Sequence, residues 1–200
     1  MIRNIVFDIG NVLVDFAWEK YFNSFGFTKE IVEKISKATV LSPQWAEFDR
    51  SSLSYGEIVD QFVAVDPSVE KEIRLVCADL HDMLVRREET IPWIQELKSN
   101  GYRVFYLSNY SQKAKEDCAD TLDFIPYMDG GILSCDEGLV KPDPAIYQRL
   151  LTKYDLVAEE CVFLDDSLIN CQAAEKEGFY AIHFRDKEDA VCRLKKLGVA

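Results

Sequence analysis

The chain has 200 residues, 48% of them hydrophobic, and carries 23 Lys and Arg against 35 Asp and Glu. This length and composition fit one folded core, or one core with a smaller appended lobe. The formal charge of −12 would repel a phosphate backbone or an anionic lipid surface, so nucleic-acid and membrane partners are not expected. No apolar stretch approaches the ~20 residues of a membrane span, and no basic-then-apolar leader is present, so we expect a cytoplasmic protein.

The six cysteines form no close Cys-x-x-Cys pair. They fall inside apolar or helical patterns, where a reduced cysteine packs as a small hydrophobic residue. The spacing therefore argues against a zinc site or a redox pair and favours free thiols in a reducing compartment. The positions are Cys77, Cys118, Cys135, Cys161, Cys171 and Cys192.

The first predicted strand is an apolar run from Ile5 to Phe7, which ends on Asp8 before a glycine turn at Gly10. A doubly wound α/β sheet keeps its chemistry outside the carboxyl ends of its strands, so Asp8 stands at a candidate functional position. A carboxylate there could attack a phosphoryl group and form an aspartyl-phosphate. It could equally well cap the turn that follows.

Segment 15–88 shows helical spacing of its apolar residues and no convincing strand. We interpret it as a helical insertion after the first strand. Ser54, three residues before Glu57, matches a capping box, and Asp66 followed by Pro67 marks a second helix start.

From Thr90 onward, helical and strand patterns alternate. Strands alternating with helices predict an α/β fold, a Rossmann-like doubly wound parallel sheet covered on both faces. The core then comprises residues 1–14 and 89–200. The expected helices lie around Trp93 to Leu97, near 112–120, over 144–154, over 168–177 and near 187–197, and the expected strands over 104–107, 131–133, 161–165 and 180–184.

Polar residues follow three more of the predicted strands. Ser108 and Asn109 could donate hydrogen bonds to phosphoryl oxygens, although both residue types are common in turns. Lys141, before a proline, could neutralise a nucleophilic carboxylate and a phosphate, or could be a solvated loop residue. Asp165 and Asp166 are adjacent acids at the end of a buried strand, which is costly without a cation or hydrogen-bond donors.

In this order and spacing, these strand ends resemble the four motifs of the haloacid dehalogenase superfamily, most of whose members are magnesium-dependent phosphatases. The resemblance implies that Asp8 is the nucleophile, that Ser108 binds the phosphoryl group and that Lys141 is the lysine of the third motif. We place Asn11 and Asn109 beside the phosphate. The implied Mg²⁺ ligands are Asp8, the main-chain carbonyl of Gly10 and Asp166, supported by Asp165. Segment 15–88 resembles the small helical cap of the family, which closes over the substrate.

Gly10 departs from the family pattern, in which an aspartate usually stands there as general acid and base. The variant Asp8-Ile9-Gly10-Asn11-Val12 resembles a subgroup that includes bacterial phosphatases acting on α-D-glucose 1-phosphate. The expected substrate is therefore a small phosphorylated metabolite, specifically a sugar phosphate. Two alternatives stay open: a 2-haloacid dehalogenase, which also lacks the second aspartate but needs no metal, and a catalytically weak binding or regulatory protein.

Within the insertion, Trp45, Phe48 and Arg50 are the predicted substrate contacts, because they are expected in an irregular stretch. His81 is expected within a helix and His183 near a strand end. Neither has a partner at metal-ligand spacing, so we interpret both as core or surface residues.

Overall fold

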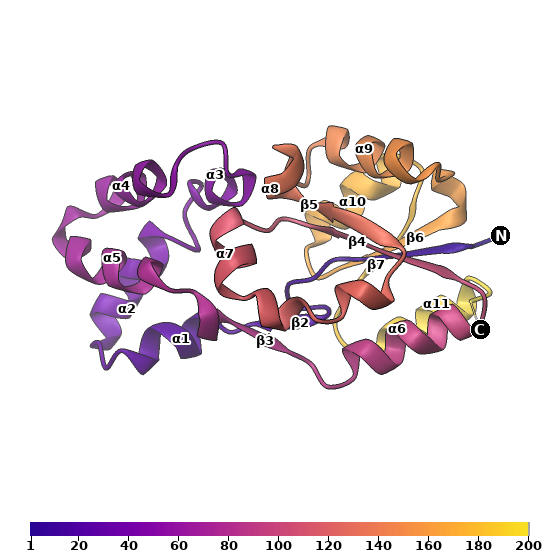
Figure 1. Cartoon of the computed structure of the whole chain (residues 1–200), viewed down its shortest axis with the longest axis horizontal. Coiled ribbons are helices and arrows are strands. Elements are labelled where there is room, and N and C mark those ends of the chain that lie inside the picture. Colours follow the sequence, from indigo (N-terminus) through magenta and orange to yellow (C-terminus); the bar gives the residue numbers. More distant parts are fainter. Residues whose placement is uncertain (200) are drawn as a thin grey trace.

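Five parallel strands form the sheet of the larger lobe in the computed structural model, which describes residues 1–199. Their order across the sheet is β5-β4-β1-β6-β7, so the chain reverses its direction of travel beside β1, and the predicted fold class is confirmed (Figure 1). The strands are β1 (Asn4–Phe7), β4 (Arg103–Ser108), β5 (Gly130–Leu133), β6 (Cys161–Asp165) and β7 (Tyr180–His183).

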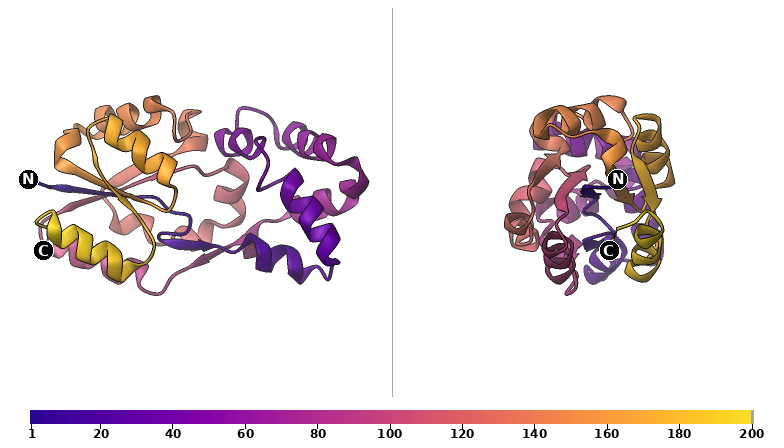
Figure 2. Two further views of the ribbon diagram at one scale, coloured as in Figure 1. Left: turned by 180° about the vertical axis from the view of Figure 1, so that it is seen from behind. Right: turned by 90° about the vertical axis from the view of Figure 1, so that its right-hand side faces the viewer.

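Helices cover both faces of this sheet because its strands alternate apolar side chains between the two faces. Phe7 points to one face and packs edge-on against Trp93, with ring centroids 4.8 Å apart. Phe163 points to the other face and packs against Tyr147 at 5.8 Å. The view along the strands shows the sheet between the two helical layers (Figure 2). The helices of this lobe are α6 (Thr90–Ser99), α7 (Gln112–Asp117), α8 (Ser134–Glu137), α9 (Pro144–Tyr154), α10 (Leu168–Lys176) and α11 (Lys187–Lys196).

A second group of helices lies beyond the carboxyl ends of the strands (Figure 1). The capping box predicted at Ser54 is present, since Ser54 N donates to Glu57 Oε2 at 2.9 Å and Glu57 N donates to Ser54 Oγ at 3.4 Å. The helices of this lobe are α1 (Trp18–Ser24), α2 (Lys29–Ala38), α3 (Trp45–Arg50), α4 (Tyr55–Val65) and α5 (Glu70–Ala78). In the described part of the chain, no helix is both long and apolar enough to cross a membrane.

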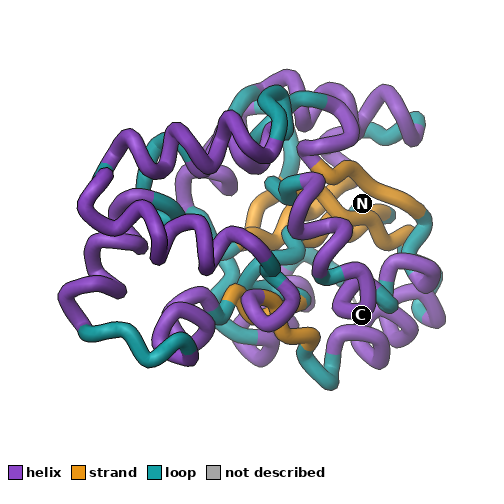
Figure 3. The backbone as a smooth tube through the Cα atoms, turned by 60° about the vertical axis from the view of Figure 1, so that its left-hand side comes forward, coloured by secondary structure: helices purple, strands orange, loops and turns teal. Residues whose placement is uncertain are grey.

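The expectation that segment 15–88 contains no strand was wrong. Strands β2 (Val14–Phe16) and β3 (Leu84–Arg86) pair antiparallel at the base of the helical lobe, apart from the main sheet (Figure 3). Each has only three residues, too few to show alternation in the sequence, and the pairing joins the two ends of the insertion.

Two predicted helices end earlier than expected. The helix near 112–120 ends at Asp117, and the helix expected to contain His81 ends at Ala78. His81 therefore lies in a short 3₁₀ turn rather than in a helix. The carboxylate of Asp79 accepts a hydrogen bond from His81 N at 2.9 Å, a local contact that competes with continuation of the helix.

The helical lobe is hydrogen-bonded to the larger lobe around the carboxyl ends of the strands. Ser134 Oγ, just after β5, donates to the carbonyl oxygen of Asp49 at 2.6 Å, and Gln112 N donates to Ser51 Oγ at 2.9 Å. Leu80 N donates to a carboxylate oxygen of Asp117 at 2.8 Å. These contacts place α3 directly over the strand ends.

Candidate active site

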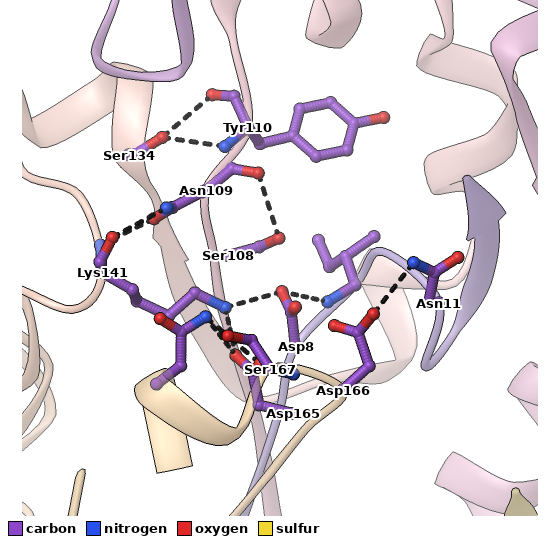
Figure 4. Close-up of polar contacts among 12 residues, drawn as sticks. Asp8, Asn11, Ser108, Asn109, Tyr110, Ser134, Lys141, Asp165, Asp166 and Ser167 are labelled. Atoms are coloured by element: carbon purple, nitrogen blue, oxygen red, sulfur yellow. Dashed lines mark hydrogen bonds and ion pairs between the residues drawn. The ribbon is translucent and has the colours of Figure 1, made fainter. Parts of the chain in front are cut away.

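Asp8 follows β1 and is almost fully buried at the centre of the sheet edge (Figure 4). Its Oδ1 atom accepts a hydrogen bond from Ile9 N at 2.7 Å and lies 2.8 Å from Lys141 Nζ. Burial, together with the charge of Asp165, raises the pKa of Asp8 to about 7, although Lys141 and the Ser108 hydroxyl favour the carboxylate form. Ser108, buried at the end of β4, thus lies beside Asp8.

Lys141 links two of the acids. Its Nζ atom is 2.8 Å from Asp8 and 2.6 Å from Asp165 Oδ2, and its side chain is only 1% exposed. Burial alone would lower the pKa of Lys141, but the two carboxylates together raise it, so the side chain stays an ammonium. The alternative of a solvated loop lysine is therefore wrong.

Asn109 holds the loop that carries Lys141. Its Nδ2 donates to Lys141 O at 3.0 Å and its Oδ1 accepts from Lys141 N at 2.7 Å. The sequence placed Asn109 beside the phosphate. In this arrangement both ends of its amide contact the backbone of Lys141, so the side chain positions the lysine.

The two adjacent acids after β6 have different surroundings. Asp165 is fully buried, and both of its carboxylate oxygens accept hydrogen bonds, from Lys141, from Ser167 N at 2.7 Å and from Asn170 Nδ2 at 3.1 and 3.2 Å. Asp166 is partly exposed, and its carboxylate accepts one hydrogen bond, from Asn11 Nδ2 at 2.9 Å. Asp166 thus keeps oxygen lone pairs free for a further ligand, whereas Asp165 has its oxygens engaged.

These residues fit a divalent cation. One carboxylate oxygen from each of Asp8, Asp165 and Asp166 lies within 4.8 Å of the others. Three carboxylates opposite the single ammonium of Lys141 leave two negative charges, which one Mg²⁺ would balance with the oxygen ligands it prefers.

Asn11 spans the turn between β1 and β2. Its φ of 56° lies in the left-handed region, which asparagine tolerates better than most residues. Its Oδ1 accepts from Phe16 N at 3.1 Å while its Nδ2 donates to Asp166. Asn11, another predicted phosphate contact, thereby ties the β2 strand to the acid that is free to bind a cation.

A pocket of about 260 Å³ opens over this site, between the two lobes. Aromatic and aliphatic side chains form most of its wall, with polar groups gathered near the strand ends. The lining residues are Gly10, Asn11, Phe16, Trp45, Asp49, Leu80, Met83, Leu84, Asn109, Tyr110, Ser111, Ala114 and Asp166.

Only one of the substrate contacts predicted in the insertion lines this pocket. They lie on helix α3, not in an irregular stretch. Trp45 lines the pocket, whereas Arg50 does not and instead lies 3.6 Å from Glu47 of the same helix. Phe48 is buried in the helical lobe. Asp49, which the sequence reasoning did not single out, lines the pocket beside Trp45.

The doubly wound sheet, the buried Asp8–Lys141–Asp165 ion pairs at its carboxyl edge and the helical lobe above them define an α/β enzyme with an acidic, cation-compatible centre. Residues 2–178 match the model of the haloacid dehalogenase-like hydrolase family, so the chain belongs to this family. The superfamily resemblance predicted from the motifs is confirmed.

Similar proteins include a phosphatase and a dehalogenase. The chain is 25% identical to the sesquiterpene phosphatase astK of Aspergillus oryzae over 192 residues, covering 96% of this chain and 94% of astK. Its fold matches the family enzyme BT-2542 of Bacteroides thetaiotaomicron, solved with magnesium and inorganic phosphate, at a TM-score of 0.68 and 21% identity, covering 92% of this chain and 95% of the other. It also matches L-2-haloacid dehalogenase of Xanthobacter autotrophicus at a TM-score of 0.65 and 14% identity, covering 100% and 85%.

Proposed function

We propose that this chain is a magnesium-dependent phosphomonoester hydrolase that forms an aspartyl-phosphate on Asp8. The observation that carries the proposal is the juxtaposition of Asp8 and Asp166, whose charge Lys141 alone does not balance. When bound, Mg²⁺ would be held by Asp8, Asp166 and the main-chain carbonyl of Gly10, and it would polarise the phosphoryl oxygens.

Each of the remaining side chains has a role in this proposal. The carboxylate of Asp8 attacks phosphorus, the ester oxygen leaves, and water then hydrolyses the aspartyl-phosphate. Ser108 donates its hydroxyl to a phosphoryl oxygen, and Lys141 offsets the negative charge of the phosphoryl group. Asp165 and Asn109 keep Lys141 in place from its two ends.

The dehalogenase alternative accounts less well for Asp166. Both activities are represented among the similar proteins, so the fold does not separate them. A metal-free dehalogenase has no evident use for a partly exposed acid within 4.8 Å of two others. The acid pair therefore favours the phosphatase.

We treat segment 15–88 as the cap of this enzyme. It contributes Trp45 and Asp49 to the pocket wall, and its two ends meet in the β2–β3 ribbon. The position of the cap over the strand ends would enclose a bound ester and exclude water from the attacking carboxylate.

The pocket wall bears on the substrate class. The first-motif resemblance favours a sugar phosphate, whereas Phe16, Trp45 and Leu84 offer a sugar few hydrogen-bonding partners. The sesquiterpene phosphatase relative supports a hydrocarbon leaving group as well. We therefore propose a small phosphate ester whose organic part is largely apolar.

This substrate class predicts a preference for geranyl phosphate over α-D-glucose 1-phosphate. We expect kcat/KM to differ by about tenfold or more, because apolar contacts in a pocket discriminate at roughly 1–3 kcal/mol. Trp45→Ala should reduce the preference, and Asp60→Asn, an exposed cap acid paired with Arg74, should leave it unchanged. A preference for the sugar ester would instead support the first-motif resemblance.

The metal site predicts that activity disappears in excess chelator and returns with Mg²⁺. Asp166→Ala should raise the Mg²⁺ concentration needed for half-maximal activity, by about tenfold or more, or abolish activity. The fold should persist because Asp166 is partly exposed and accepts one hydrogen bond. Full activity with chelator present, together with halide release from a 2-haloacid, would contradict the phosphatase assignment.

A further inference from the structure

The family usually has an aspartate at position 10, on the larger lobe, as its general acid and base. This chain has Gly10 there, which has no acidic side chain. Space does not explain this, since a Cβ added to Gly10 would meet no heavy atom within 4 Å, leaving aside its two chain neighbours. An ester hydrolysed here still needs a proton for its leaving oxygen and a base for the incoming water. Another residue of the pocket has to serve both needs.

Asp49 has the right chemistry and the right place. It lies on α3 and lines the same pocket as Gly10 and Asp166. Its backbone is held to the larger lobe by the hydrogen bond from Ser134 Oγ to its carbonyl oxygen, at 2.6 Å. Asp49 thus lines the pocket from the cap side, and its carboxyl group is close enough to feel the charges of Asp8 and Lys141.

The carboxylate of Asp49 also differs from the other acids of the site. Within residues 1–199 it has no hydrogen-bond or ion-pair partner, whereas Asp8, Asp165 and Asp166 each have at least one. An unpaired, half-buried carboxylate is costly, and structures normally retain such groups where they serve a function.

We propose that Asp49 is the general acid and base of this enzyme, acting from the cap in place of the residue absent at position 10. The inference rests on the phosphatase function proposed above. It adds a catalytic residue that the motifs of the larger lobe do not contain.

The two half-reactions balance with one proton on Asp49. As Asp8 bonds to phosphorus and the phosphorus–oxygen ester bond breaks, protonated Asp49 gives its proton to the leaving oxygen and becomes a carboxylate. That carboxylate then takes a proton from water while the water oxygen bonds to phosphorus and the bond to Asp8 breaks. Alcohol and phosphate leave, and both aspartates return to their starting states.

The electrostatic surroundings suit this cycle. Burial first, and then the negative charge of Asp8, raise the pKa of Asp49 to about 8, while Lys141 opposes the shift. A neutral carboxyl group at neutral pH is the form that the first half-reaction requires. The charge of Asp49 also acts on Cys135 of the neighbouring helix α8. Burial raises the pKa of that thiol to about 11, above the pH range in which Asp49 titrates.

The test compares leaving groups in Asp49→Asn. The variant should lose about 10²–10⁴-fold in kcat/KM on a primary alkyl phosphate such as hexyl phosphate, whose leaving oxygen needs a proton. It should lose less than about tenfold on 4-nitrophenyl phosphate, whose leaving oxygen does not. Asp60→Asn, the same chemical change on an exposed cap acid, should affect neither ester.

A pH profile separates catalysis from a structural role. Wild-type kcat/KM on hexyl phosphate should fall at alkaline pH, as Asp49 loses its proton, and this descending limb should be absent in Asp49→Asn. Asp49→Asn should melt no lower than wild type, because the change removes an unpaired carboxylate. Equal losses on both esters, or no loss on hexyl phosphate, would overturn the role of Asp49 and leave the phosphatase standing. A wild-type enzyme that hydrolyses neither ester would overturn the proposed function and this inference with it.

Discussion

Asp8→Asn is expected to abolish turnover while the protein stays folded. An amide cannot attack phosphorus, and loss of a nucleophile lowers kcat by about 10⁴–10⁶-fold. The fold should persist because Asp8, Asp165 and Lys141 together carry one net negative charge. Removing the charge of Asp8 leaves a balanced ion pair between Lys141 and Asp165.

Two measurements check this expectation. Steady-state rates give the loss in kcat, and mass spectrometry of acid-quenched wild-type enzyme should find one phosphoryl group on the peptide that contains Asp8. Asp60→Asn is the control for a charge lost elsewhere and should retain wild-type rates. Near-wild-type turnover by purified Asp8→Asn would contradict the nucleophile assignment.

The strand ends could be predicted from the sequence because parallel strands bring their carboxyl ends to one edge. Asp8, Ser108 and Asp165 each follow or end a buried apolar strand, and the structure brings them together. Apolar runs and capping residues are local signals, which is why the sheet and most helix bounds followed from them.

Contacts between segments far apart in the sequence could not be predicted in this way. The β2–β3 ribbon depends on pairing between strands too short to show a pattern. The hydrogen bonds between the Asn109 amide and the backbone of Lys141 depend on the path of the loop before Pro142. The local sequence around Asn109 does not indicate that path.

The spacing of Asp49 from Trp45 is a sequence signal that becomes visible once 45–50 is interpreted as a helix. Trp45 was predicted to contact the substrate, and in a helix the residue four positions later shares its face. Interpreting 45–50 as irregular makes no use of this periodicity and leads to Arg50, which does not line the pocket. The acid that shares the face of Trp45 is Asp49.

Lys141→Met is expected to remove activity and to lower stability by about 3–5 kcal/mol, the usual cost of leaving a buried charge without its partner. Asp8 and Asp165 would then face each other with no ammonium between them. Lys141 Nζ lies 5.3 Å from the ring centroid of Phe163, a cation–π contact that methionine would replace with a contact between its sulfur and the ring. Because methionine is similar in length to lysine, the loss should be electrostatic rather than steric.

The stability lost in Lys141→Met should increase as the pH rises. Burial already holds the folded-state pKa of Asp8 above its unfolded value, and without Lys141, which opposes that shift, it rises further. Folding then costs more as the pH rises above about 4, the ordinary pKa of aspartate. Denaturant unfolding in the presence of chelator should therefore show the largest deficit at neutral pH and a smaller one below pH ~4. Lys37→Met, which removes an exposed pair with Glu33, should leave the free energy of unfolding almost unchanged at either pH.

A double variant separates the two roles of the lysine. Lys141→Met combined with Asp165→Asn restores the single net negative charge that Asp8, Asp165 and Lys141 carry in the wild type, so part of the lost stability should return. Activity should not return, because no cation from the chain then faces the phosphoryl group. Wild-type stability of Lys141→Met at neutral pH would contradict this account, because the ion pairs of Lys141 with Asp8 and Asp165 would then not be what holds the site together.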